Sequence, residues 1–177
     1  ANEGIEIEVL TGEQIKPVHW KTMYTLYVGI TYKKWAHDYL TEGFFDYISK
    51  NFQENVVLVM AKKDNKYIAG ALNFRKNEHL YGRYWGCLVE HQCLHFEVCY
   101  YQSIEYAIKE GIKLFEAGAQ GEHKLSRGFL PEYTYSAHWI ADTRFSPAIA
   151  DFLKKEKNSI YNLMENYEQN SPFKKLA

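Results

Sequence analysis

The spacing of apolar residues changes several times along the first third of the chain. Residues 5–10 alternate between polar and apolar side chains, which predicts a half-buried strand. Residues 17–34 and 42–52 repeat apolar side chains every three or four positions, which predicts two amphipathic helices. Pro17 suits the first turn of the first helix, and Thr41 suits the N-cap of the second.

The middle of the chain has the pattern of a β-sheet. Residues 56–63, 66–74 and 79–88 are rich in β-branched and aromatic side chains, and short polar turns separate them. We therefore expect an antiparallel meander of three strands. Residues 94–101, LHFEVCYY, have a similar composition and are expected to form a fourth strand.

A crossover connection is expected next. Residues 102–111 have a helical pattern and end in Gly111, a good helix C-cap, and residues 112–118 form another apolar run. A strand, a helix of about ten residues and a strand form the smallest βαβ unit. The strands at 94–101 and 112–118 should therefore be parallel.

The order of the elements indicates the fold class. Residues 133–141 alternate again and predict a last strand, and residues 147–168 predict a long amphipathic helix. The whole pattern is typical of an α+β (α/β) protein with a mixed, mostly antiparallel sheet flanked by helices. A chain of 177 residues is expected to build this fold as a single domain, residues 1–177.

Composition and charge exclude some classes of protein. The apolar fraction is 46% and the charged fraction 24%, which is typical of a globular protein. The formal net charge of -1 gives no basic field for nucleic acid. No apolar run reaches the roughly 20 residues of a membrane span, and no signal peptide is evident, so a cytoplasmic protein is expected.

The three cysteines favour thiols over a disulfide framework or a metal site. Cys87, Cys93 and Cys99 are an odd number, which argues against a secreted disulfide scaffold. They also lack the paired CxxC spacing of structural zinc sites, so we expect no metal.

The stretch 116–129, EAGAQGEHKLSRGF, has the strongest chemical signal. It follows the predicted parallel strand, where clefts in α/β units usually lie. Gly118 and Gly121 would allow close approach of a ligand, while Lys124 and Arg127 would share one helical face and bind an anion. The alternative is a solvated turn whose charges pair with one another.

Two further stretches carry candidate side chains. In residues 79–88, strand alternation would place Tyr81, Arg83 and Trp85 on one face, where Arg83 would bind an anion, stack on a ring or face solvent. In residues 94–101, alternation would place His95, Glu97 and Cys99 on one face, next to Glu116 of the following strand.

Such a cluster would suit a general base. Burial and like charge raise the pKa of a carboxyl group and fit Glu97 or Glu116 to accept a proton. A buried cluster that satisfies only its own hydrogen bonds is equally compatible with the pattern. His138 is expected to be a packed or hydrogen-bonded histidine.

Several segments together resemble the FemAB-like predicted N-acyltransferases, bacterial proteins of peptidoglycan biosynthesis or recognition in the GNAT superfamily. The resemblance runs from about residue 5 to 173 and rests on ALNF, LYGRYWG, LHFEVCYYQSIEYAI, EAGAQGEHKLSRGFLP, TYSAHWIAD and SPF. It implies a GNAT-like fold whose parallel strands splay apart around the acyl donor. It also implies that this chain is the C-terminal half of a longer protein whose N-terminal GNAT-like half is missing here.

The resemblance also suggests partners. The wider Fem ligases transfer amino acids from aminoacyl-tRNA to a cell-wall precursor and have a glycine-lysine-glycine-phenylalanine element after this strand. Gly118, Gly121, Lys124, Gly128 and Phe129 look like its counterparts.

One segment departs from the superfamily pattern. GNAT enzymes that use acetyl-CoA have a glycine-rich pyrophosphate loop between the fourth strand and its helix, whereas the expected junction here, VCYYQSIEY, has no glycine. The resemblance therefore leaves three donors open: aminoacyl-tRNA, an acyl-CoA cosubstrate held differently, or a ligand bound between two halves. No tightly bound cofactor is expected.

These observations support an N-acyltransferase that acts on an amine. The alternatives are a non-catalytic module that binds an anionic or peptidoglycan-like ligand in the same cleft, or a structural half that completes a site elsewhere. For the enzyme, Glu97 or Glu116 is the expected base. The expected substrate-binding residues are Arg83, Trp85, Tyr81, His95, Gln120, His123, Lys124, Arg127 and Tyr135.

Overall fold

The computed structural model describes residues 4–33, 39–118, 122–169 and 173. The chain divides into two compact units, Ala1–Ala119 and Gln120–Ala177. The first unit contains the sheet and all three clusters of buried apolar residues. In the described residues, the second contains two 3-10 helices, an irregular segment and one long helix, so we describe the units separately.

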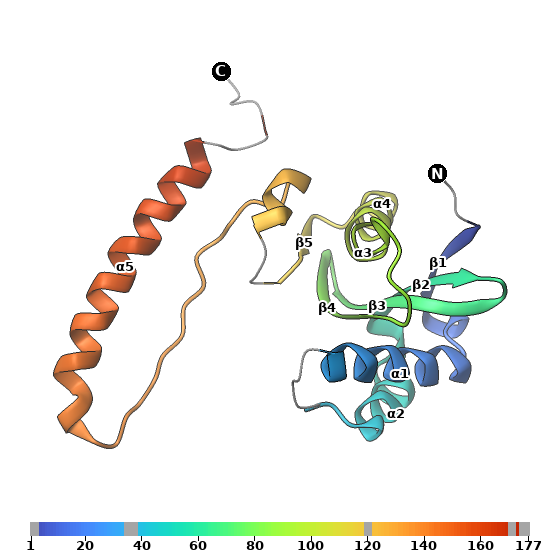
Figure 1. The fold of residues 1–177 in the computed structure, drawn as a ribbon, viewed down its shortest axis with the longest axis horizontal. Coiled ribbons are helices and arrows are strands. Elements are labelled where there is room, and N and C mark those ends of the chain that lie inside the picture. The colour runs from blue at the N-terminus through green and yellow to red at the C-terminus, as the bar shows by residue number, and fades with distance from the viewer. Residues whose placement is uncertain (1–3, 34–38, 119–121, 170–172, 174–177) are drawn as a thin grey trace. The chain divides into compact units, whose positions relative to one another are not determined.

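A five-stranded mixed sheet forms the centre of the first unit (Figure 1). Its strands run in sequence order: β1 (Ile5–Thr11), β2 (Val56–Lys63), β3 (Lys66–Lys76), β4 (His79–Cys87) and β5 (Leu114–Glu116). The first four strands are antiparallel neighbours, and β5 pairs parallel to β4. This confirms the expected meander. A parallel pair is present, but it joins β5 to β4, so the expected parallel pairing of residues 94–101 with residues 112–118 is wrong.

Helices cover both faces of the sheet (Figure 1). Helices α1 (Pro17–Lys33) and α2 (Glu42–Asn51) pack on one face. The other face is covered by a continuous helical segment made of α3 (Leu94–Phe96), a π-helix (Glu97–Tyr101) and α4 (Gln102–Lys109). Short 3-10 helices lie at Gly12–Gln14 and Gln53–Asn55.

Local sequence explains most of these elements. Residues 56–61 of β2 are all apolar and all buried, as expected for a strand that is covered on both faces. Asp64 and Asn65 both have positive φ, as a two-residue hairpin turn between antiparallel strands requires. Gly111 follows α4 with a φ of 65°, the left-handed conformation of a helix C-cap.

The predicted strand at 94–101 is wrong. Its buried residues are Leu94, Val98 and Tyr100, and the next buried positions along the helix are Ser103 and Ala107. The spacing of five from Val98 to Ser103 is accommodated by the π-helix, whose wider turn keeps one face against the sheet. The crossover therefore runs from β4 through this helical segment to β5.

The second unit contains three helical elements: 3-10 helices at Glu122–Arg127 and Thr143–Phe145, and α5 (Ser146–Gln169). The long C-terminal helix is confirmed. Residues 133–141 do not form the predicted strand, because this segment has no strand partner among the described residues.

A polar network links β1 and β3 to α1. Tyr67 donates to Glu8 Oε1 at 2.5 Å, and His19 Nε2 lies 2.9 Å from the Tyr67 hydroxyl. His19 Nδ1 accepts from the Lys16 N–H at 2.9 Å, so the ring is held neutral. Burial lowers the pKa of His19 from 6.5, and burial together with the bond to Glu8 raises the pKa of Tyr67 to about 12.

This network predicts two pH limits on stability. The unfolded chain binds a proton at His19 more readily than the folded chain, so the free energy of unfolding should fall as pH drops below 6.5. The folded chain keeps the Tyr67 proton longer, so stability should also fall as pH rises from 10 towards 12. Urea unfolding at different pH values tests both limits. Tyr67→Phe is expected to reduce the alkaline one but not to remove it, because burial also raises the pKa of Tyr84 to about 12.

Candidate functional site

β4 and β5 pair over a short distance and then diverge. Their paired residues are His79 with Leu114, Leu80 with Phe115, and Tyr81 with Glu116. β4 continues to Cys87, and residues 82–87 have no strand on the β5 side in the described part of the chain. Backbone donors and acceptors along a strand edge that no other strand pairs point away from the neighbouring strand, so residues 82–86 can present such groups to a ligand. We call this opening, between residues 82–87 and the end of β5, the splay.

A β-bulge lies at the start of the open edge. Leu72 pairs with Tyr84 while Asn73 pairs with Gly82, so Arg83 is the extra residue on β4. The bulge interrupts the simple alternation expected for this strand. Leu80 therefore packs beside α4, on the helical face that Trp85 and Cys87 also contact.

Aromatic rings gather next to the open edge. The Trp85 and His95 rings lie 4.7 Å apart, and His95 also contacts Tyr100 at 5.5 Å. The Arg83 guanidinium lies 5.5 Å from the centre of the Tyr81 ring. Stacking on an aromatic ring was one of the three alternatives predicted for Arg83. These contacts bring Trp85 and His95 together from different elements, although the strand that should have carried His95 is a helix.

The two candidate bases occupy different surroundings. Glu97 lies in the π-helix, is half-buried and accepts a 2.8 Å hydrogen bond from Gln102. Glu116 is exposed at the end of β5, opposite Tyr81, where the two strands separate. A Cβ at Gly82 would lie 3.5 Å from the Glu116 carbonyl oxygen, so the Glu116 backbone borders the closed end of the splay. The predicted face of His95, Glu97 and Cys99 on one strand is therefore wrong.

The basic side chains Lys124 and Arg127, which we call the cationic stretch together with the rest of residues 122–127, lie in the second unit. Glu122–Arg127 is a 3-10 helix, in which residues three apart align, as expected for Lys124 and Arg127. Both of these side chains are half-buried, whereas His123 is exposed. Arg127 Nη1 donates to the His123 carbonyl at 2.6 Å. Gln120 lies outside the described residues.

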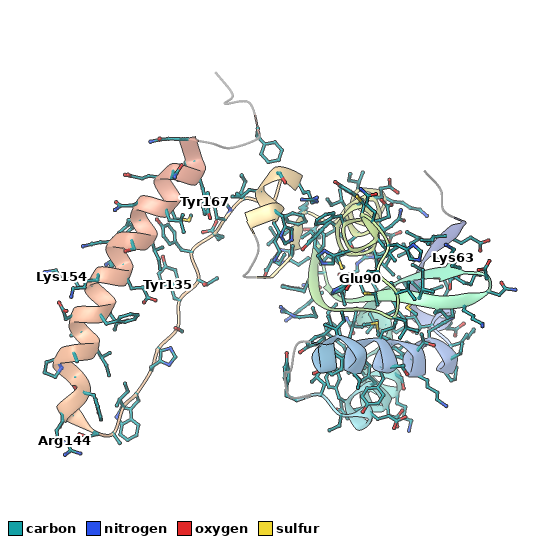
Figure 2. The ribbon with its side chains drawn as sticks, viewed as in Figure 1. Lys63, Glu90, Tyr135, Arg144, Lys154 and Tyr167 are labelled. Carbon is teal, nitrogen blue, oxygen red and sulfur yellow. The ribbon has the colours of Figure 1, made fainter. Side chains whose placement is uncertain are left out.

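A glycine with positive φ precedes this 3-10 helix, and another follows it. Gly118 and Gly128 have φ values of 85° and 86°, so the left-handed backbone expected for Gly118 is confirmed. A Cβ at Gly128 would lie 3.0 Å from the Phe173 ring, so that ring packs against this turn. Tyr135 is 90% exposed and lies on the irregular segment in Figure 2, and His138 contacts the Ser136 hydroxyl at 2.9 Å.

The junction between β4 and the helix that follows it lies earlier in the chain than the sequence predicted. It comprises residues 88–93, LVEHQC, and it also lacks glycine. Cys93 ends it with a φ of 63°, and Glu90 is an exposed carboxylate (Figure 2). A loop that contains a carboxylate and no glycine, lysine or arginine does not fit the pyrophosphate of CoA in the usual GNAT manner. We therefore derive no step through that group.

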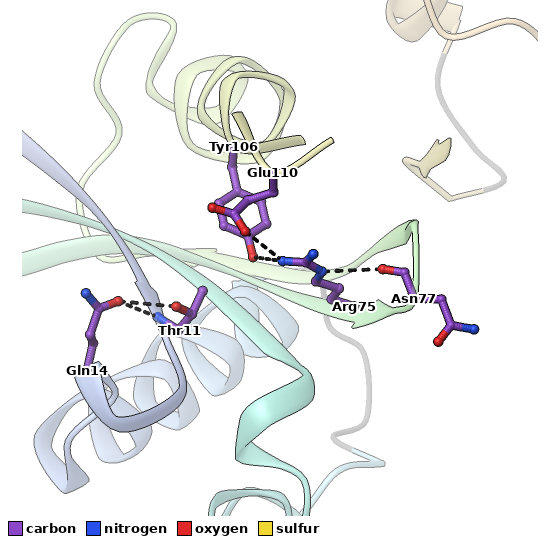
Figure 3. Close-up of polar contacts among 6 residues, drawn as sticks. All are labelled: Thr11, Gln14, Arg75, Asn77, Tyr106 and Glu110. Atoms are coloured by element: carbon purple, nitrogen blue, oxygen red, sulfur yellow. Dashed lines mark hydrogen bonds and ion pairs between the residues drawn. The ribbon is translucent and has the colours of Figure 1, made fainter. Parts of the chain in front are cut away.

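A cavity of about 560 Å³ lies where β1 and β3 end and β2 begins. In Figure 3, Arg75 Nη1 donates to the Tyr106 hydroxyl and to Glu110, both at 3.0 Å, and its Nε donates to the Asn77 carbonyl at 3.4 Å. At the end of β1, the N–H and the hydroxyl of Thr11 both donate hydrogen bonds to Gln14 Oε1. No motif marked these residues in the sequence, because an arginine near the end of a strand is common.

No helix in the described residues has the length and apolar character needed to cross a bilayer. Those residues also contain no group of three or more His, Cys, Asp or Glu side chains that is arranged to hold a metal ion.

The splayed parallel pair and the crossover helix define the fold class of this chain. Three solved structures show the same GNAT acetyltransferase fold at low identity. An aminoglycoside acetyltransferase from an uncultured soil metagenomic sample, in complex with trehalose, is 12% identical with a TM-score of 0.54, covering 80% of this chain and 97% of its own. A ribosomal-protein-alanine N-acetyltransferase from Brucella melitensis biovar Abortus 2308 is 9% identical with a TM-score of 0.51, covering 79% and 100%. A probable acetyltransferase is 11% identical with a TM-score of 0.54, covering 77% and 99%.

The chain belongs to the FemAB-like family, described as peptidoglycan biosynthesis/recognition, whose profile matches residues 1–175. A comparison with curated proteins finds no match. The family and fold that the sequence resembled are thereby confirmed.

Proposed function

We propose that this chain is an N-acyltransferase domain that transfers an acyl or aminoacyl group to an amine. The observation that carries the proposal is the open backbone edge of residues 82–87 beside the short parallel pair. Backbone N–H groups on such an edge can hold the carbonyl oxygen of an activated donor where negative charge develops. The structural neighbours with this fold are acetyltransferases, which supports the same reaction class.

The chemistry needs little covalent machinery. The amine nitrogen attacks the carbonyl carbon of the donor, a new C–N bond forms, and the bond from that carbon to the leaving sulfur or oxygen breaks. The acceptor ammonium must first lose a proton to a carboxylate, directly or through a water molecule, because only the neutral amine has a lone pair with which to attack; the departing sulfur or oxygen takes up a proton as it leaves. Positioning of the two reactants then supplies much of the rate.

Glu116 is our first candidate for the base because it is exposed at the end of β5, where that strand leaves β4. Glu97 is the second, because its carboxylate is already engaged by Gln102. Trp85 and His95 are proposed to contact the acyl group or the acceptor. Tyr81 and Arg83, which lie on β4 together with Trp85, are proposed as further contacts.

Substrate identity belongs to the proposal as well. The family description favours a peptidoglycan-related acceptor. The junction at 88–93, without glycine, favours a donor other than acetyl-CoA bound in the usual manner, such as an aminoacyl-tRNA or a differently held acyl-CoA. We assign Lys124 and Arg127 to an anionic part of the donor or acceptor, with Gln120, His123 and Tyr135 as further contacts.

The same observations favour one alternative function. A recognition module would bind a peptidoglycan-like ligand through the cationic stretch without turnover, in agreement with the second half of the family description. It would depend on Lys124 and Arg127 but would tolerate loss of the Glu97 and Glu116 carboxylates.

Calorimetric titration tests the ligand assignment. Binding of a muropeptide, an acyl-CoA or an aminoacyl-tRNA should weaken at least about tenfold in Lys124→Ala/Arg127→Ala, because each charged contact contributes more than about 1 kcal/mol. Lys154→Ala/Lys155→Ala, on exposed positions of α5, is the matched control. Equal affinity of wild type and the Lys124/Arg127 variant would remove these residues from the binding site.

A further inference from the structure

One polar side chain is buried within the sheet, and its oxygen has no hydrogen-bond donor. Asn73 on β3 is 1% exposed, and of the three buried polar residues in the described part of the chain it alone lies on a strand. Its Nδ2 donates to the Val57 carbonyl at 3.1 Å, whereas no described residue donates to its Oδ1. An unpaired polar atom at a buried position costs stability, so this oxygen calls for a donor.

The hydrogen bond to Val57 fixes the orientation of the Asn73 amide. The nitrogen and the oxygen of an amide have nearly the same shape and are told apart by their hydrogen-bond partners. A backbone carbonyl accepts and cannot donate, so the amide nitrogen faces Val57 and the oxygen faces away from it.

Asn73 Oδ1 lies at the point where β4 and β5 separate. Asn73 pairs with Gly82, and the last parallel pair before the splay is Tyr81 with Glu116. A Cβ at Gly82 would lie 3.5 Å from Asn73 Oδ1 and 3.5 Å from the Glu116 carbonyl oxygen. All of these residues belong to the first unit. Two acceptor oxygens, from the strands on either side of β4, therefore converge at the closed end of the splay (Figure 1).

Gly82 leaves the approach to these two oxygens open. A side chain at this position would stand in front of them, and glycine has none. Glycine inside a strand often marks a place where a ligand comes close to the backbone. Gly82 is half-buried, so a ligand in the splay can reach it.

Two acceptors at one point favour a ligand group with more than one N–H. A hydroxyl or a secondary amide has a single proton and satisfies only one of the oxygens. A primary ammonium group has three N–H donors and satisfies both. The negative charge of the Glu116 side chain also favours a cation over a neutral carboxamide.

We propose that Asn73 Oδ1 and the Glu116 carbonyl oxygen bind a primary ammonium group of the ligand at the closed end of the splay. The identity of the ligand rests on the proposed function: the group is the amine of the acceptor or the amino group of an aminoacyl donor. In both cases Asn73 is a positioning residue, because it holds the nitrogen and takes no part in the bond changes.

Two-dimensional ¹⁵N–¹H NMR of residues 1–177 tests the site through the side-chain amide of Asn73. An amine-bearing muropeptide is compared with the same muropeptide acetylated at that amine, and alanine ethyl ester is compared with ethyl propionate. The Asn73 signal should shift saturably with at least one amine-bearing probe and not with its counterpart, because only the ammonium group donates to both oxygens. The first pair reports on the acceptor and the second on the donor, so the probe that binds identifies the source of the group.

Substitutions separate recognition from folding. Gly82→Ala should keep the fold and weaken binding of the amine-bearing probe at least about tenfold, because its methyl group stands in front of both oxygens. Asn73→Leu should weaken binding by a similar factor, and Gly82→Ala keeps the test decisive if this variant fails to fold. Gly43→Ala on α2 is the matched control: its methyl group would lie 3.6 Å from Thr41 Oγ1, and the affinity should stay within about twofold. Circular dichroism checks the fold of each variant.

Three results would overturn the ammonium site. The first is no saturable shift of the Asn73 signal with either amine-bearing probe at concentrations up to about 10 mM. The second is an equal shift with a probe and its counterpart, and the third is an unchanged affinity in Gly82→Ala. A chain that binds the amine at Asn73 but transfers no acyl group would contradict the transferase and leave the site intact.

Discussion

Replacing Gly86 with alanine should lower the free energy of unfolding by about 3 kcal/mol. A Cβ at this position would lie 2.2 Å from the carbonyl oxygen of Leu26 and 2.3 Å from its carbonyl carbon. These are backbone atoms of α1, so relief requires the whole helix to move away from β4. Thermal unfolding should show a loss of roughly 10 °C for a chain of this size.

Gly82→Ala is the matched control on the same strand. A Cβ there would approach its neighbours no closer than 3.5 Å, an ordinary contact distance. We therefore expect a change of less than about 1 kcal/mol. Equal destabilisation by both substitutions would contradict the assigned packing of α1 against β4.

Replacing Glu116 with glutamine should lower kcat about 100- to 10,000-fold, the usual range for loss of a general base. The substitution keeps the size of the side chain and removes its capacity to accept a proton. KM and the free energy of unfolding should change little, because the side chain is exposed. Steady-state kinetics with the active donor and acceptor, combined with urea unfolding, separates these effects.

Two further carboxylates serve as comparisons. Glu105→Gln on the exposed side of α4 should have no effect on kcat. Glu97→Gln should affect kcat less than Glu116→Gln, because the amide can still accept the hydrogen bond from Gln102. If Glu97→Gln removes activity while Glu116→Gln does not, the roles of the two carboxylates are reversed.

The local patterns that predicted the sheet were short-range ones. Asp64 and Asn65 fix the turn between β2 and β3, and Gly111 ends the crossover helix before β5. Such turn residues act on their own neighbours, so they are readable without tertiary information. The same holds for Pro17 and Thr41 at the starts of α1 and α2.

The error at 94–101 has a physical cause. Aromatic and β-branched side chains in LHFEVCYY favour strands, and the buried positions of this segment depart from a regular helical repeat. The π-helix accommodates the extra residue, and packing of Val98 against the sheet outweighs the local preference. The pairing of β5 with β4 was therefore hidden, although a parallel pair was expected.

The candidate site was predictable only in part. Strand composition pointed to Tyr81, Arg83 and Trp85, and the structure brings His95 to Trp85. The bulge at Arg83 depends on how β3 and β4 pair, which no single strand encodes. The contacts of Arg75 with Tyr106 and Glu110 join residues more than 30 positions apart and have no local signature.

The most direct test of the account is a transfer assay read by mass spectrometry. The chain is incubated with an amine-bearing muropeptide and, in separate reactions, with an acyl-CoA or an aminoacyl-tRNA. We expect a product heavier than the acceptor by the acyl or aminoacyl group, with an amide at the acceptor amine, and about 100-fold less of it or lower with Glu116→Gln. Saturable binding of the muropeptide without product from any donor would contradict the transferase and support the recognition module.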